Sequence, residues 1–220
     1  MSSEDRRARE KMAVQERILN AARELFVKEG FEAVSLRKIA EAIDYTAPAL
    51  YTHFKDKTEL VKALCRQDFG ALSGALVKAA RMADPVQRIM RIGHGYIRFA
   101  VDNPHQYRFM MMTAHRADVE PDAEDIAEKD DPDRDGYAAL RRAVADAIAQ
   151  RLLRPEIKDA ELGAQVLWAG VHGIASLQIA MGDEPWINWR SVERRARLMC
   201  ESLLRGMLRD PARLEGGEQA

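Results

Sequence analysis

Residues 18–64 read ILNAARELFVKEGFEAVSLRKIAEAIDYTAPALYTHFKDKTELVKAL and carry the clearest structural pattern in the chain. Apolar residues recur there at helical spacing up to Gly30, which suits the left-handed position that ends a helix. Ser35 and Thr46 each precede a short apolar run, where a hydroxyl oxygen can accept a hydrogen bond from the first N–H groups of a helix. The stretch predicts one helix from about Val14 to Lys28 and two short helices after it, which together form a helix-turn-helix unit.

The second short helix, which begins after Thr46, has an inward and an outward side. Leu50 and Phe54 are four residues apart and should anchor it against the other two helices, because residues at this spacing share a face. The remaining side chains of this helix stay available to a DNA major groove. For Tyr51 and His53, plain packing within the domain is the alternative.

This stretch resembles the DNA-binding domain of the TetR family at many positions in one register. The matching residues are Ala22, Leu25, Phe26, Gly30 and Phe31, then Ser35-Leu36-Arg37-Lys38-Ile39-Ala40, and then Leu50, Tyr51, His53, Phe54, Lys55 and Lys57. The resemblance implies DNA contacts by Ser35, Arg37, Tyr45, Thr46, Ala47, Pro48, Tyr51, Thr52, His53 and Lys57. The family usually has a glycine near position 44, where this chain has Asp44; aspartate tolerates a left-handed backbone better than most residues, so the turn can form.

Some of these residues are expected to contact DNA phosphates and others to contact bases. By the resemblance, Tyr51 and Lys57 contact backbone phosphates, and Ser35 stands at a helix start whose N–H groups suit a phosphate oxygen. Arg37 stands where some family members read guanine, and its guanidinium fits the two acceptors of that base. The residues Ala47–Ala49 offer no side-chain hydrogen bonds, so base reading should depend on thymine methyl groups, Arg37 and DNA shape.

Helical periodicity continues through the rest of the chain, between its 13 Gly and 8 Pro residues. No stretch alternates apolar and polar residues for long enough to indicate a sheet. Further helices are expected at about 56–80, 85–102, 104–113, 137–153, 160–181 and 189–208. We therefore expect an all-α protein of about nine helices, a three-helix DNA-binding domain followed by a helical effector and dimerisation domain. The expected divisions are a flexible N-terminal extension (1–13), the helix-turn-helix domain (14–62), the ligand-binding and dimerisation domain (63–210) and a frayed tail (211–220).

Acidic residues crowd the segment 118–136, where Lys129 and Arg134 are the basic residues present. Such charge density together with two prolines is typical of a solvated, mobile loop. A calcium-binding loop is the alternative, although the acidic residues do not follow the EF-hand order and the position that needs glycine lacks it.

Composition narrows the class of protein. The chain has 34 Lys and Arg against 35 Asp and Glu, so any DNA contact must come from a local patch rather than from overall charge. The two cysteines, Cys65 and Cys200, are too few and too far apart for a disulfide scaffold or a zinc module.

The five histidines are scattered, and no catalytic or phosphate-binding motif occurs, so we expect no enzyme activity, no metal and no cofactor. Without a long apolar run or a signal-like start, a cytoplasmic protein with no membrane partner is expected.

The segment VLWAGVHGIASLQIA contains Trp168, His172 and Gly173 in the order W-x-x-x-H-G. It resembles the motif that names one group of TetR-family effector domains. Trp168 and His172 share a helix face, and they either line a ligand cavity or simply pack in the core. The cavity hypothesis takes as candidates His94, Tyr96, Tyr107, Met110, Met111, Trp168 and His172. Because these are mostly apolar and include no Lys or Arg, we expect a small, mostly apolar effector held by one or two hydrogen bonds to His94 or His172.

Two further helices carry a pattern that suits a dimer interface. Gly170 and Gly173 would let a second helix approach closely. The last helix has an apolar stripe at Val192, Ala196, Met199, Leu203 and Met207. By the family resemblance, such helices pair across a two-fold axis, while burial of the stripe within one chain is the alternative.

These features together predict a sequence-specific transcriptional regulator. We expect a homodimeric repressor that binds a palindromic double-stranded DNA operator and is released by its effector. The alternative is a helical adaptor that binds protein partners through its acidic loop and amphipathic helices.

Overall fold

The structure, a computed structural model, describes residues 3–113 and 123–214. Over those residues it has 10 α-helices and one π-helical segment, with no β-strand beyond an isolated bridge between Leu153 and Leu208. The predicted all-α class is confirmed. In that part of the chain, no helix is both long and apolar enough to span a bilayer.

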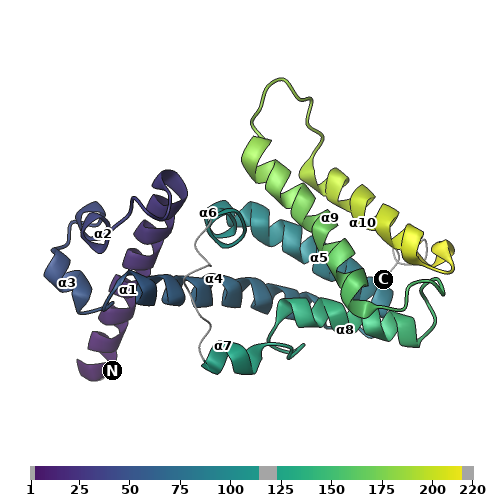
Figure 1. The fold of residues 1–220 in the computed structure, drawn as a ribbon, viewed down its shortest axis with the longest axis horizontal. Coiled ribbons are helices and arrows are strands. Elements are labelled where there is room, and N and C mark those ends of the chain that lie inside the picture. Colours follow the sequence, from purple (N-terminus) through teal and green to yellow (C-terminus); the bar gives the residue numbers. More distant parts are fainter. Residues whose placement is uncertain (1–2, 114–122, 215–220) are drawn as a thin grey trace. The chain divides into compact units, whose positions relative to one another are not determined.

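The helices follow one another along the chain as labelled in Figure 1. They are α1 (Ser3–Glu29), α2 (Leu36–Ala42), α3 (Ala47–Tyr51), α4 (Lys57–Ala79), α5 (Pro85–Asp102), α6 (Pro104–Tyr107), the π-helical segment η1 (Arg108–Met112), α7 (Ala123–Glu128), α8 (Gly136–Ala149), α9 (Ala160–Met181) and α10 (Val192–Met207).

The first helix begins at Ser3 rather than at Val14, so the predicted flexible extension is helical from Ser3 onward. An apolar stripe could not reveal this part of α1, because its described side chains up to Ala13 are exposed. Strong helix formers such as Arg, Glu and Ala fill it, and Arg6 pairs with Glu10 one turn later, at 3.7 Å.

The predicted acidic loop contains a short helix, α7, and residues 118–122 of that segment lie outside the described residues. A turn follows α7, with Asp130 at φ 70°, and Asp135 then caps α8 by accepting the N–H of Tyr137 at 2.8 Å. The calcium alternative finds no support in the described part, where no three His, Cys, Asp or Glu side chains are grouped to hold a metal ion. The last helix starts at Val192, after the N-cap Ser191, rather than at about 189.

The chain forms two compact units that differ from the predicted division after residue 62. Unit 1 is Met1–Gly70 with His105–Asp122, and unit 2 is Ala71–Pro104 with Ala123–Ala220. Helix α4 therefore contributes to both units. The segment that contains most of α6 and all of η1 packs with the helix-turn-helix unit, although the chain reaches it only after α5.

Unit 1 encloses a core that unites α1 with α2, α3 and the first part of α4. Its largest fully buried side chains include Phe26, Ile39, Leu50 and Leu60. Phe26 also stacks on Phe109 of η1, with ring centroids 5.9 Å apart. This stack explains why η1 belongs to unit 1, since aromatic pairs add to the gain from burial alone.

A buried ion pair links α1 to α4 within unit 1. Arg23 is 5% exposed and Asp68 is fully buried. The Nε and Nη2 atoms of Arg23 donate to the two carboxylate oxygens of Asp68 over 2.8 and 2.7 Å. Asn20 accepts from Nη1 of Arg23 at 2.7 Å, and Gln106 of α6 donates to Asp68 at 3.0 Å. The network satisfies both buried charges and connects three helices.

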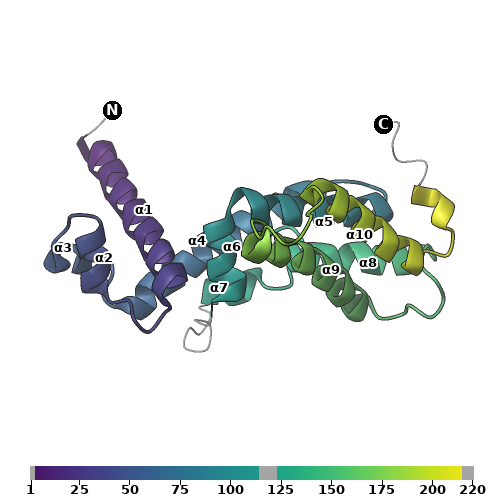
Figure 2. The ribbon, with the colours of Figure 1, turned by 90° about the horizontal axis from the view of Figure 1, so that it is seen from above.

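Unit 2 is a helical bundle in which α5, α8, α9 and α10 pack against one another (Figure 2). Small residues bring the helices close. A Cβ on Gly163 would lie 2.9 Å from Val144 of α8, and one on Gly170 would lie 2.6 Å from Leu203 of α10. Gly163 and Gly170 of α9 thus serve packing inside the chain, where a larger residue would push the helices apart.

We expect Asp68→Ala to destabilise the protein by about 3–5 kcal/mol, because it leaves the Arg23 guanidinium buried without a counter-charge. Urea unfolding followed by circular dichroism measures the change. The matched control is Arg98→Ala, which removes the exposed pair with Asp102 and should lower the free energy of unfolding far less. Equal losses in the two variants would contradict this account of the buried pair.

Candidate functional site

The two short helices of the helix-turn-helix unit are capped as the sequence predicts. The Ser35 hydroxyl accepts the N–H of Lys38 at 3.2 Å, and the Thr46 hydroxyl accepts the N–H of Ala49 at 3.4 Å. Each cap satisfies one N–H of the first turn, and helix starts leave further N–H groups that can meet a phosphate.

The turn between these helices depends on Asp44, which has φ 58°. This confirms that aspartate holds the left-handed position where the family usually has glycine. Next to it, the Arg17 side chain donates to the carbonyl of Ile43 at 3.3 Å and lies 5.4 Å from the centroid of the Tyr45 ring. Arg17 of α1 therefore packs directly on the turn. Tyr45 is half-buried there.

Helix α3 has the inward and outward sides that the spacing predicts. Leu50 and Phe54 are buried, whereas Tyr51 is 55% exposed. The other predicted contacts on this unit are exposed at Ser35, Arg37, Thr46, Pro48 and Thr52, and half-buried at Ala47 and His53. The Nδ1 atom of His53 is buried and has no hydrogen-bond partner among the described residues, which favours the packing alternative for this residue.

Arg37 lies on the exposed surface of α2 and pairs with Glu41 at 2.9 Å. Such exposed pairs contribute only about 0–1 kcal/mol, so contact with a base can replace this one at little cost.

Lys57 has partners that differ from the predicted phosphate. Its ammonium donates to the backbone carbonyl of Phe31 and lies 3.8 Å from the centroid of the Phe31 ring. The side chain is half-buried and holds the start of α4 to the turn after α1. The aromatic residue directly after Gly30 was the sequence signal for this cation–π contact. Lys55, two residues earlier, is exposed instead.

In unit 2, three of the predicted effector residues meet. The indole N–H of Trp168 donates to the Tyr96 hydroxyl at 3.1 Å, and that hydroxyl lies 3.4 Å from Nδ1 of His172. We call Tyr96, Trp168 and His172 the Trp–Tyr–His cluster. Tyr96 is buried, His172 is half-buried and Trp168 is partly exposed. Burial lowers the pKa of His172, which favours its neutral form.

Tyr137 extends this cluster toward the start of α9. Its ring centroid lies 5.7 Å from that of Trp168, and its hydroxyl donates to Glu161 at 2.5 Å. Burial and the hydrogen bond to Glu161 raise the pKa of Tyr137 to about 12. Sequence analysis missed both residues, because neither belongs to the motif around Trp168.

The other predicted effector residues lie elsewhere. Tyr107, Met110 and Met111 belong to unit 1, where Tyr107 and Met110 are buried in its core. His94 is exposed on one side, while burial of the rest of its ring, and to a smaller extent the Arg197 charge, lowers its pKa. The predicted set is therefore divided between the two units, since spacing along a helix does not show which face packs against which neighbour.

The predicted dimer stripe on α10 serves mostly packing within the chain. Ala196 and Met207 are buried, and Val192, Met199 and Leu203 are half-buried. Gly170 is covered, because a Cβ there would lie 2.7 Å from the Met199 sulfur and 2.6 Å from Leu203, whereas nothing lies within 4 Å of one on Gly173. Two of the five stripe residues are thus buried within the chain, and the other three keep part of their surface exposed.

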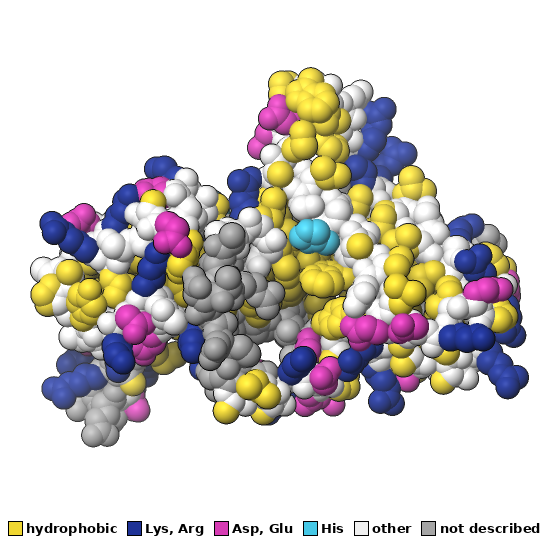
Figure 3. Space-filling model, in the orientation of Figure 1, with side chains coloured by type: hydrophobic (Ala, Val, Ile, Leu, Met, Phe, Trp, Pro, Cys, Tyr) yellow, Lys and Arg dark blue, Asp and Glu magenta, His cyan; other side chains and the backbone are white. Residues whose placement is uncertain are grey.

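Helix α9 carries an exposed apolar stripe that the sequence analysis did not single out. Leu162 is 59% exposed, Val166 44% and Leu177 46%, and the exposed Ala169 and half-buried Gly173 fall between them. The spacing puts these five residues, the α9 stripe, on one helix face. Hydrophobic side chains gather over α9 and the loop after it in Figure 3. Because α9 is apolar on several sides, periodicity could not distinguish its outer face.

Comparison with known proteins identifies the family. The sequence pattern of bacterial regulatory proteins of the TetR family matches residues 18–64, and that of the tetracyclin repressor-like C-terminal domain matches residues 89–203. The chain belongs to the TetR family.

Individual relatives agree with this family. The transcriptional repressor AcnR of Corynebacterium glutamicum is 32% identical over 95 residues, 42% of this chain and 43% of that protein. The matches span less than half the length of such curated relatives. The TetR-family regulator PfmR of Thermus thermophilus is 25% identical, with a TM-score of 0.69 over 86% of this chain and 97% of PfmR. AibR, whose structure holds isovaleryl coenzyme A and operator DNA, shares the fold at 21% identity, with a TM-score of 0.67 over 86% of this chain and 96% of AibR.

The lowered pKa of His172 predicts a contribution to pH-dependent stability. Below about pH 6.5 the unfolded chain takes up a proton on this residue before the folded chain does, so acid favours unfolding. The free energy of unfolding should therefore fall less between pH 7.5 and pH 5.5 in His172→Gln than in the unaltered protein. Urea unfolding at several pH values measures this, and parallel curves for the two proteins would contradict the assignment.

Proposed function

We propose that the protein is a transcriptional repressor that acts as a homodimer on a palindromic operator in the cytoplasm and is released by a small effector. Family membership supports this, together with one observation on the molecule itself. Tyr51, Thr52 and Pro48 of the recognition region are exposed, while Leu50 and Phe54 hold that region on the core. A surface of this kind can enter a major groove without disturbing the fold.

The chemistry of the exposed surface suggests how DNA is read. Ala47 and Pro48 contribute methyl and ring contacts, which suit thymine methyl groups, and Arg37 supplies the guanidinium for a guanine. Tyr51 and the start of α2 at Ser35 contact phosphates. Exposed Lys55 takes the phosphate role first expected of Lys57, whose ammonium already binds the Phe31 carbonyl.

Substitutions should separate these roles. Tyr51→Phe and Lys55→Ala should weaken binding to all DNA sequences alike, and Lys55→Ala should also reduce the salt dependence. Arg37→Ala should relax the preference at one base pair, at a cost of about 1–3 kcal/mol there. Footprinting on the DNA upstream of the gene locates the binding site, and gel-shift titrations against that site and its single-base variants measure both effects.

Lys57→Ala is the matched control for Lys55→Ala. It should lower the free energy of unfolding, because a cation–π contact and a hydrogen bond are lost, while the salt dependence of DNA binding stays unchanged. If Lys57→Ala reduced the salt dependence of DNA binding and Lys55→Ala did not, Lys57 and not Lys55 would be the residue that contacts a phosphate.

We assign the dimer interface to the α9 stripe, which keeps Gly173 of the interface first expected and leaves out its residues on α10. The stripe is continuous along α9, and its central residues Ala169 and Gly173 are small enough for a second helix to approach. Pairing of two such faces about a two-fold axis would bury apolar side chains that one chain leaves exposed.

Val166→Glu should give a folded monomer, because a charge in the middle of an apolar interface would lack a partner. Light scattering measures the mass, and circular dichroism shows that the helices are kept. The control is Ile126→Glu on α7, where the side chain is also exposed and lies outside the α9 stripe. If the Val166→Glu protein were still a dimer, the proposal that the interface lies on α9 would be wrong.

For the effector site we propose the Trp–Tyr–His cluster, in keeping with the resemblance to the W-x-x-x-H-G group. Trp168 supplies an apolar face, and the neutral His172 offers a hydrogen bond for orientation. This surface suits a small, mostly apolar molecule, since no charge lies within the cluster to balance a charged one.

A further inference from the structure

The first part of α1, residues 5–13, lies outside the core of unit 1, and we call it the α1 extension. Each of its nine side chains is exposed, whereas the core contacts of α1 begin with the buried Ile18. Figures 1 and 2 both show this end of the helix extending clear of α2 and α3. Most of the stability of a protein helix comes from a packed face, and this stretch has none. The α1 extension therefore offers all its faces to solvent or to a partner.

Charge distinguishes the α1 extension from the rest of the DNA-binding region. Residues 14–62 have eight Lys and Arg against eight Asp and Glu, so they carry no net charge. The extension has four basic residues against two acidic ones, namely Arg6, Arg7, Arg9 and Lys11 against Asp5 and Glu10. Duplex DNA has one negative charge for about every 1.7 Å of its axis, and a protein binds it largely by neutralising phosphates. The extension thus supplies the surplus positive charge that residues 14–62 lack.

The arginines of the extension keep hydrogen-bonding capacity for a ligand. Arg6 pairs with Glu10 at 3.7 Å, but the two side chains are 70% and 68% exposed. Such an exposed pair is weak, so Arg6 can exchange its carboxylate partner for a phosphate at little cost. Arg7 and Arg9 have no hydrogen bond or ion pair with another described residue. A guanidinium has five N–H donors and can hold a phosphate through two parallel hydrogen bonds.

Helix geometry places these arginines on the side of α1 that faces the helix-turn-helix turn. Arg17 marks this side, because it packs on the turn that leads into α3, 5.4 Å from the centroid of the Tyr45 ring. Arg6 precedes Arg17 by eleven residues, which is about three full turns of helix, so it lies on the same side. Arg7 and Arg9 lie within about 90° of this direction, one on each flank.

The length of the extension matches the size of a DNA groove. A helix rises about 1.5 Å per residue, so Arg9 lies about 12 Å and Arg6 about 16 Å beyond Arg17 along α1. The major groove is about 12 Å wide, and a recognition helix enters it with its first residues. Because Arg17 packs beside the turn that leads into α3, an extension of this length can reach phosphates at the edge of the groove that α3 enters.

We propose that the α1 extension is a second DNA-binding surface, on which Arg6, Arg7 and Arg9 bind phosphates at the edge of the groove that α3 enters. The proposal rests on DNA binding by the helix-turn-helix unit, and it adds contacts from a helix that carries none of the contacts implied by the family resemblance. Duplex DNA is the occupant because the side of the extension toward the turn is basic and continues the DNA-binding unit. The opposite side has only Ala8 and Met12, which are too few apolar residues to pair two helices.

The combined variant Arg6→Gln, Arg7→Gln and Arg9→Gln in the full chain tests the proposal; we call it the extension variant. The probes are a duplex that the protein selects from a random library and a duplex of unrelated sequence, each titrated at several salt concentrations. Each phosphate contact adds about 0.9 to the slope of log K against log salt concentration, so the slope should fall by about two to three for each bound chain. On both duplexes the Kd at low salt should rise at least about tenfold, because phosphate contacts carry no sequence information.

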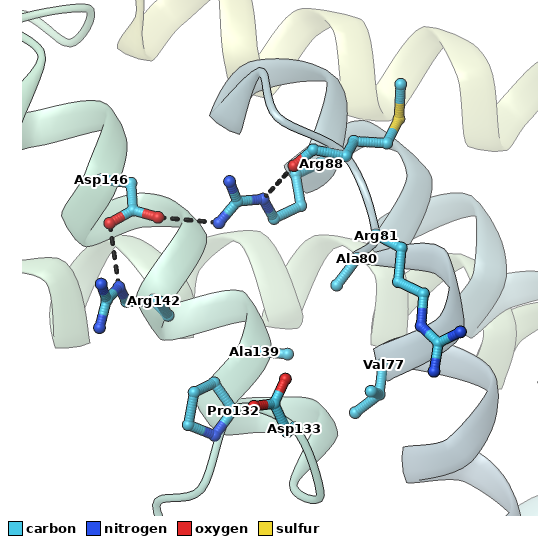
Figure 4. A pocket seen from close by; sticks show the side chains of 10 residues that line it. Val77, Ala80, Arg81, Arg88, Pro132, Asp133, Ala139, Arg142 and Asp146 are labelled. Carbon is cyan, nitrogen blue, oxygen red and sulfur yellow. Dashed lines mark hydrogen bonds and ion pairs between the residues drawn. The ribbon is translucent and has the colours of Figure 1, made fainter.

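Two control proteins separate the position of the charges from their number. Arg98→Gln, Arg134→Gln and Arg142→Gln together remove three charges from exposed ion pairs of unit 2, and they should leave the slope unchanged. Figure 4 shows one of these pairs, Arg142 with Asp146 of α8. Three Arg→Lys replacements in the extension keep its charge and should keep the slope. Gln and Lys are good helix formers, and circular dichroism verifies that the helix content is kept.

Four results would overturn the proposal. They are an unchanged slope in the extension variant, an equal loss of slope in the unit 2 variant, a changed base preference at an unchanged slope, and a loss of the dimer in light scattering of the extension variant. The third would make the extension a reader of bases, and the fourth would make it a contact between two chains. If the library yields no selected sequence, the proposed repressor function fails, while the unrelated duplex still measures the slope.

Discussion

The carboxylate of Asp68, fully buried on α4, requires the guanidinium of Arg23 on α1, and much of unit 1 is arranged around this pair. A buried charge without its partner costs several kcal/mol, on the order of 3–5, so α1 and α4 must keep their register wherever the unit is folded. Gln106 of α6 donates a hydrogen bond to Asp68 of the same pair, and Phe109 of η1 stacks on Phe26. The polar link and the aromatic stack thus bring a segment that follows α5 in the chain onto the helix-turn-helix unit.

The chain passes between the two units at three places, after Gly70, after Pro104 and after Asp122. Helix α4 contributes to both, and α5 of unit 2 leads directly into α6 of unit 1. A change of state in unit 2 can therefore reach the DNA-reading unit through α4 and through the α5–α6 connection. The free energy available is the effector's differential affinity for the two states, typically about 1–3 kcal/mol. That is less than the cost of breaking the Arg23–Asp68 pair, so unit 1 should respond as one body and keep this pair.

Local sequence was a good guide wherever one residue type determines the conformation. The caps at Ser35 and Thr46, the left-handed Asp44 and the buried pair Leu50 and Phe54 were all predictable, because each follows from nearby residues alone. The register of the helix-turn-helix could thus be predicted almost completely. Long-range packing was the limit. The cation–π contact of Lys57 with Phe31 and the burial of Met207 depend on which helix faces pack together, and periodicity does not specify this.

The central claim is that two copies of the chain present their α3 helices to a symmetric DNA site. Selection of bound sequences from a random double-stranded DNA library by the full chain tests it most directly, because such a selection works without a defined operator. The account predicts an enriched palindrome whose half-sites are about one helical turn or somewhat more apart, with thymine at the positions facing Ala47 and Pro48. A selected pool without enrichment, or an enriched single half-site without symmetry, would contradict it.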